Sequence, residues 1–176
     1  MKKVAVIVLA FALFMMAFTV APVMAKAEKV SVAGLSVITG GELPDDFRAW
    51  ETEGGTVHAR GGVALSISRY WIGVSSVPNP ALNPTYVFAV RSDVSSNNNE
   101  KTERGVSLWK SVMSYPATGT VQGTFEGVMH VEGDGSLTTM HVVYQGTGMF
   151  EGQTMVVSGT KQSGQPGVIE GFLLTR

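Results

Sequence analysis

The residues best suited to chemistry flank a predicted hairpin turn at Asp134-Gly135. Asp-Gly is a preferred two-residue turn between antiparallel strands, and it would set position 130 opposite 139 and 128 opposite 141. His130 and His141 would then be diagonal neighbours on one face, with Glu132 beside them. Zinc and other divalent ions accept imidazole and carboxylate ligands. The pattern therefore offers a divalent-metal site, with a solvated strand face as the alternative.

A second candidate lies in the stretch GGTVHARGG, where His58 and Arg60 alternate on one strand face. An imidazole and a guanidinium together could bind an anionic ligand at the mouth of a barrel. Two structural alternatives stay open. Either the face is simply exposed, or Arg60 pairs with Glu51 or Glu53.

Large aromatic side chains are the third group of candidate site residues, and many of them lie in the N-terminal two thirds of the chain. Small-molecule pockets are lined by such rings together with a few polar groups. Trp71, Tyr86 and Trp109 are the candidates for a ligand pocket, together with His58 and Arg60. The alternative is that the same rings fill a solid interior.

Several kinds of active site lack their signature residues. The chain has no cysteine, which excludes disulfides, thiolate metal sites and a cysteine nucleophile. No GxSxG motif supports a serine hydrolase. The glycines of GTGMFEG are spaced GxGxxxG rather than the GxGxxG of dinucleotide sites. No catalytic residue is assigned, and no cofactor is predicted beyond the possible divalent metal.

The pattern Gly-x-(Phe/Ile)-Glu-Gly occurs three times, at 123–127, 148–152 and 167–171. A repeated motif favours a structural role over a single ligand loop. Glycine permits bulges and tight coiling in a sheet, and a large apolar neighbour fills the space beside it. We therefore predict that these glycines bend strands.

The stretches GTVQGTFEGVMHVEG and GTGMFEGQTMVVSGT resemble the glycine-bracketed strands of the allene oxide cyclase and dirigent-like barrels, which are calycin-like. The resemblance covers about the last third of the chain. It implies an eight-stranded antiparallel barrel with a central cavity open at one end. It transfers no catalytic residue, because no cyclase motif is found in the N-terminal two thirds.

The elements that would position these residues are β-strands, because period-two alternation dominates the chain. Pro44 to Trp50 is the best helical candidate, but it is short and we expect a plug or connecting turn there; 75–84 and 93–104 are predicted loops. The predicted strands are 30–38, 56–67, 70–74, 85–92, 105–114, 120–132, 137–144, 149–158 and 168–175. So many antiparallel strands close on themselves to remove their edges. The predicted fold is all-β, a single antiparallel eight- or nine-stranded β-barrel.

Residues 1–25 predict the localisation of the protein. Lys2 and Lys3 precede an apolar run that ends in small residues at Ala25, as in a secretory signal peptide. We therefore predict a signal peptide over 1–25 and one barrel domain over 26–176, in a secreted or extracytoplasmic protein. A retained signal would instead anchor the protein to the membrane. An eight-stranded transmembrane barrel is another alternative, because the signal, the length and the period-two strands also fit it.

The charge balance, 13 basic against 14 acidic side chains, offers no basic face for nucleic acid. The leading prediction is a secreted small barrel that binds a hydrophobic or amphipathic small molecule. One alternative is a non-enzymatic structural or surface-interaction module. The other is an isomerase-like enzyme of the cyclase-barrel type, for which fold alone is a weak argument.

Overall fold

The computed structural model describes residues 27–79, 81–99, 102, 104–134 and 136–175, and confirms the all-β prediction. The predicted signal segment lies outside these ranges. Within them, no helix is long and apolar enough to cross a membrane. The strands are β1 (Glu28–Glu42), β2 (Arg48–Glu51), β3 (Thr56–Ile72), β4 (Tyr86–Asn99), β5 (Arg104–Tyr115), β6 (Gly123–Gly133), β7 (Leu137–Gly148), β8 (Thr154–Gln162) and β9 (Gly167–Thr175).

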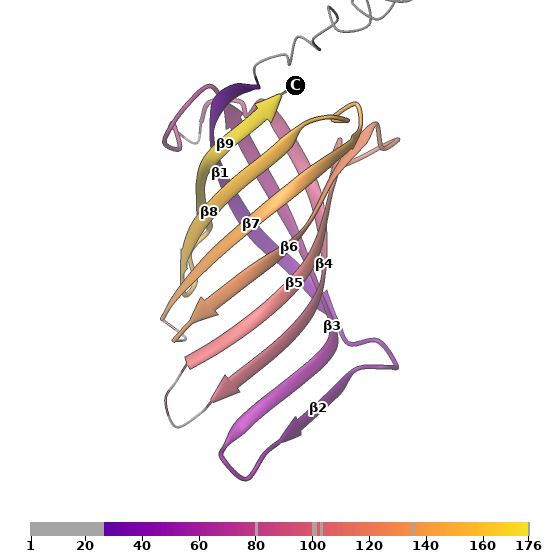
Figure 1. Cartoon of the computed structure of the whole chain (residues 1–176), viewed down its shortest axis with the longest axis vertical. Coiled ribbons are helices and arrows are strands. Elements are labelled where there is room, and N and C mark those ends of the chain that lie inside the picture. Colours follow the sequence, from indigo (N-terminus) through magenta and orange to yellow (C-terminus); the bar gives the residue numbers. More distant parts are fainter. Residues whose placement is uncertain (1–26, 80, 100–101, 103, 135, 176) are drawn as a thin grey trace, which may run out of the picture.

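Eight of these strands form a closed antiparallel barrel (Figure 1). From β3 to β9 each strand pairs with the next one in the chain, and β1 pairs with both β9 and β3. The double pairing of β1 closes the sheet. Closure satisfies the backbone groups that an open sheet would leave at its two edges.

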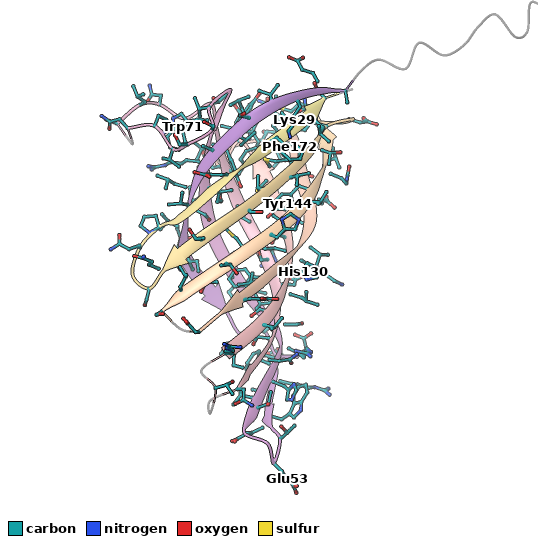
Figure 2. All side chains as sticks on the ribbon, turned by 60° about the vertical axis from the view of Figure 1, so that its left-hand side comes forward. Lys29, Glu53, Trp71, His130, Tyr144 and Phe172 are labelled. Carbon is teal, nitrogen blue, oxygen red and sulfur yellow. The ribbon has the colours of Figure 1, made fainter. Side chains whose placement is uncertain are left out.

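The ninth strand, β2, lies outside the barrel on an extension of β3. β1 pairs with Val63 to Ile72 of β3, whereas β2 pairs with Val57 to Arg60. The register between β3 and β4 shifts next to Gly61, whose φ of 80° favours glycine. Beyond this bulge β2 and the first part of β3 project past the barrel, and Glu53 marks the tip (Figure 2).

Two predicted elements can be compared with the structure in this region. The segment from Pro44 to Trp50, expected to be a plug or connecting turn, is a turn followed by the first residues of β2. Much of the loop predicted over 93–104 is strand, because β4 continues to Asn99. A run of serine and asparagine, considered without its partners in the fold, indicates a loop. Here Asn97 and Asn99 face partners on β3, His58 and Thr56, that accept or donate hydrogen bonds.

Aromatic rings pack one end of the barrel solid. Phe150 lies against Phe125 with ring centroids 4.7 Å apart and contacts Tyr86 and Tyr115 edge-on. Phe88 joins the same cluster and is 1 % exposed. These residues come from the start of β4, the end of β5, the start of β6 and the β7–β8 turn. They therefore close the barrel end where these segments meet.

The 148–152 copy of the glycine motif runs from the last residue of β7 through a turn, so the prediction that its glycines bend a strand is wrong for this copy. β7 ends at Gly148, and the amide of Glu151 donates to the Gly148 carbonyl. Gly148 and Gly152 have φ of 60° and 79°, in the region that favours glycine. The turn directs Phe150 into the barrel. In the other two copies Phe125 and Ile169 point into the barrel from β6 and β9.

Candidate functional site

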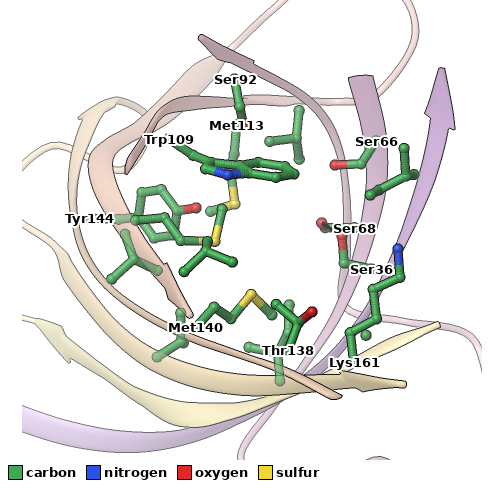
Figure 3. Close-up of a pocket in the computed structure, with 18 of the residues that line it drawn as sticks. Ser36, Ser66, Ser68, Ser92, Trp109, Met113, Thr138, Met140, Tyr144 and Lys161 are labelled. Atoms are coloured by element: carbon green, nitrogen blue, oxygen red, sulfur yellow. Dashed lines mark hydrogen bonds between the residues drawn. The ribbon is translucent and has the colours of Figure 1, made fainter. Parts of the chain in front are cut away.

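The candidate site is a cavity of about 270 Å³ inside the barrel, beside the aromatic cluster (Figure 3). Its lining residues extend to the ends of β1, β6 and β8 and to the starts of β5, β7 and β9. Those strand ends belong to the end of the barrel opposite the aromatic cluster. The cavity thus occupies the half that the rings leave unfilled.

Two pairs of serines lie in different parts of the barrel wall around this cavity. Ser36 lies opposite Ser68 across β1 and β3, and the Ser68 hydroxyl donates to the Ser36 hydroxyl at 3.0 Å. Ser92 lies opposite Ser111 across β4 and β5, with their hydroxyls 2.7 Å apart and both side chains buried. In each pair one hydroxyl donates to the other, which leaves the hydrogen of the accepting hydroxyl available for a further bond. Small side chains at inward positions leave the space that larger ones would fill in a barrel of this size.

Much of the remaining lining is apolar and forms a wall. It is formed by Met113, Met129, Met140, Val142, Val157 and Ile169. Methionine is flexible and polarisable, so it adapts to ligands of different shape. The wall therefore suits a hydrocarbon portion without imposing one outline.

Two buried tyrosines also line the cavity. Tyr70 and Tyr144 are each paired across strands with a glycine, Gly34 and Gly127, where an added Cβ would meet the tyrosine ring at 2.8 and 2.9 Å. Burial raises the pKa of Tyr144 to about 12, although a hydrogen bond with Ser111 lowers it. Burial and, to a lesser degree, Tyr144 hold the pKa of Tyr70 well above its ordinary value. Both hydroxyls stay protonated at neutral pH.

Of the residues predicted for a ligand pocket, Trp109 is the one that lines the cavity. Its indole Nε1 is buried and has no hydrogen-bond acceptor among the described residues. A buried donor without a partner costs about 1–3 kcal/mol. A ligand with an acceptor atom would remove that cost.

The other predicted aromatic residues lie elsewhere. Tyr86 belongs to the aromatic cluster at the closed end. Trp71 is 6 % exposed and follows the inward-facing Tyr70, so strand alternation directs it outward. Its indole nitrogen is also buried without a partner in the described chain. Neither ring lines the cavity.

His58 and Arg60 lie on the β2–β3 extension and do not line the cavity. His58 Nδ1 is 2.8 Å from Asn97 Oδ1, and its ring stacks on Trp50 at 5.1 Å. Arg60 donates to the same Asn97 oxygen at 3.2 Å and to the Ser96 carbonyl at 3.1 Å. Because Oδ1 only accepts, His58 Nδ1 carries a hydrogen. The two residues predicted to bind an anion instead contact Trp50 of β2 and Ser96 and Asn97 of β4.

The predicted register of the 130–141 hairpin is wrong, although its shared face is correct. His130 lies directly opposite His141, and Glu132 lies opposite Thr139. Asp134 Oδ1 accepts hydrogen bonds from the amides of Ser136 and Leu137, both at 3.0 Å. These bonds and that of the Ser136 hydroxyl lower the pKa of Asp134 to about 2. The wider turn that they stabilise shifts the pairing by two residues.

The two histidines lie on the outer face, in a groove that Glu132 also lines (Figure 2 labels His130). His141 Nδ1 is 2.9 Å from the Ser158 hydroxyl. In the described part of the chain no three His, Asp or Glu side chains form a group that could hold a metal ion. The structure thus brings the imidazoles together without a third protein ligand, and metal binding stays a prediction.

Sequence reasoning missed most of the cavity. Ser66, Ser68 and Tyr70 alternate in one phase of β3, which is a readable signal for one inward face. Lys161 lines the cavity in phase with Met155 and Val157 of β8. The predicted strand stopped at 158, so this lysine was left outside it.

The fold and the cavity define the class of protein: a small antiparallel β-barrel with a partly hollow interior. A scan against protein-family models and searches of curated proteins and solved structures found no match. The resemblance to allene oxide cyclase and dirigent-like barrels therefore stays a prediction.

Proposed function

We propose that this protein binds a hydrophobic or amphipathic small molecule inside the barrel, without catalysing a reaction. The observation that carries the proposal is the contrast between the two halves of the barrel. Aromatic rings pack one half, while serines and an apolar wall line a cavity of about 270 Å³ in the other. Pockets for small molecules are commonly of this kind, apolar with a few placed polar groups.

The hydroxyls of the cavity support binding rather than catalysis. Ser36 with Ser68, and Ser92 with Ser111, are engaged with one another rather than with a general base. Tyr70 and Tyr144 have raised pKa values, so neither phenol supplies a phenolate base at neutral pH. The signal-like sequence over 1–25 supports export, and we propose that binding takes place outside the cytoplasm.

The test is native mass spectrometry of the protein purified after export from an expression host. We expect an excess mass that organic extraction removes. Ser66→Phe places a ring in the cavity and should abolish the excess mass. Thr160→Phe adds the same ring on the outer face of β8 and should preserve it. A bare mass for the native protein in several hosts would contradict the proposal.

A surface-interaction module is the second candidate, favoured by an apolar row on the outer face. Val128, Val143, Val156 and Phe172 lie opposite one another across β6 to β9. Val128 and Val143 are 45 % and 44 % exposed, and Lys29 Nζ lies 4.1 Å from the Phe172 ring centroid (Figure 2). Contiguous exposed apolar surface marks interaction sites. Concentration-dependent sedimentation that Val143→Lys abolishes would support this candidate.

A further inference from the structure

The ammonium group of the cavity lies together with several of its hydroxyls. Figure 3 shows Ser36, Ser66, Ser68, Thr138 and Lys161 along one side and the bottom of the cavity, whereas Ser92 lies at the top with Trp109 and Met113. A ligand that satisfies both sides must itself have a polar end and an apolar end. The polar end would meet hydroxyls and one ammonium group.

Lys161 is the charged residue of this lining; the other nineteen described lining residues are neutral. Its inward position follows from β8, where Met155, Val157 and Gly159 share its phase. The side chain is partly buried, and none of the described carboxylates forms an ion pair with it. A partly desolvated ammonium is stabilised by an anion at hydrogen-bond distance.

The size and charge of the cavity limit the ligand. One lysine matches one negative charge, so a monoanion is favoured over a dianion such as a phosphate monoester. Because liquid water takes ~30 Å³ per molecule, the cavity holds about nine water volumes, or a ligand of roughly ten non-hydrogen atoms. The methionine and valine wall suits a hydrocarbon chain of that length.

We propose that the cavity binds a monocarboxylate amphiphile, with its carboxylate at Lys161 and its chain against Met113, Met140 and Val157. This inference rests on the proposed binding function and adds the chemical class of the ligand. The carboxylate accepts from the ammonium and from the neighbouring hydroxyls of Ser36 and Thr138. The chain displaces water from the apolar wall.

The experiment is calorimetric titration of the purified protein with octanoate, octan-1-ol and octylammonium, which share one chain and differ in head group. We expect octanoate to bind about tenfold to a hundredfold more tightly than octan-1-ol, the range of one charge-assisted hydrogen bond. Octylammonium should bind most weakly. Lys161→Met should bring octanoate to the affinity of the alcohol, and Lys161→Arg should retain the preference.

Lys110→Met is the matched control, because Lys110 lies on the outer face of β5 and lines a separate surface groove. It should leave the preference for octanoate unchanged. Retained alcohol binding by Lys161→Met shows that this variant is folded. If octan-1-ol binds the native protein as tightly as octanoate, or if the preference survives Lys161→Met, the carboxylate inference is wrong while the proposed function stands. If none of the three binds, both are wrong.

Discussion

Two tyrosines show how single residues shape the interior. Each ring lies over a glycine of the neighbouring strand, where any side chain would collide with it. The small partner lets the ring lie close to the sheet, and the hydroxyl of Tyr70 reaches Met113 Sδ at 3.7 Å. Burial of both phenols then favours their neutral form. The hydroxyls thus act as donors in a largely apolar region.

Alkaline pH should destabilise the fold through Tyr144. Its pKa is raised from 10.0 to about 12, so the stabilisation is fully present below pH 10 and is lost as the pH rises toward 12. The loss for this residue is about 2 kcal/mol at pH 12. Urea unfolding at pH 8 to 12, followed by tyrosinate absorbance, measures it.

Tyr144→Phe should be somewhat less stable at pH 8 and lose less stability between pH 10 and 12. Tyr86→Phe, in the aromatic cluster, controls for the removal of one phenol. An unchanged pH dependence in Tyr144→Phe would show that this phenol ionises equally in the folded and unfolded chains.

The cavity could be predicted only in part from the sequence. Trp109 was identified because its type suits a pocket, and it lines the cavity. His58 and Arg60 are residue types that bind anions equally well, yet both side chains form hydrogen bonds with Asn97 Oδ1. Residue type does not reveal partners 37 or 39 positions away along the chain. Lys161 was missed because strand ends are the least certain part of a pattern.

At the scale of elements, the β7–β8 turn does more than connect two strands. It places Phe150, 2 % exposed, among rings from three other segments, while its neighbour Met149 is 46 % exposed. The amide of Phe150 donates to Thr147, and that of Gln153 donates to Phe150, which fixes the turn. The turn therefore closes one end of the barrel.

Phe150→Ala should lower the free energy of unfolding by about 3–5 kcal/mol, because it removes a ring from a packed cluster and leaves a cavity. Met149→Ala, one position earlier in the same turn, should change it by about 0.5 kcal/mol or less. Equilibrium urea unfolding of both variants makes the comparison. Equal losses would mean that the turn backbone, not the ring, is what stabilises this end.

Strands were easier to predict than their pairing. Alternation of residue types identified the barrel strands, although β3 was divided in two and β4 was cut short. The hairpin register failed because it depends on one side chain, Asp134, whose hydrogen bonds select a wider turn than Asp-Gly alone would favour. Similarly, whether the Ser-Asn run at 95–99 is loop or strand depends on pairing with β3.

At the scale of the whole molecule, β3 belongs both to the barrel and to the β2 extension. Its C-terminal part closes the barrel against β1, and its N-terminal part carries the β2 extension. Every residue of β2 is exposed, and within the sheet it pairs with β3 alone. Barrel strands by contrast have a neighbour on both sides. The extension and the barrel should therefore differ in local stability.

Native-state hydrogen exchange at increasing low guanidinium concentrations should separate the two. Amides of β2 should exchange by local opening that denaturant hardly affects, because little surface is exposed. Amides of β6 to β8 should exchange only by global unfolding, with a steep dependence on denaturant. Trp50→Ala, which removes the ring stacked on His58, should accelerate exchange in β2 and leave the barrel unchanged. A steep dependence in β2 would instead mean that Asn97 and Arg60 couple the extension to barrel closure, so that both unfold as one unit.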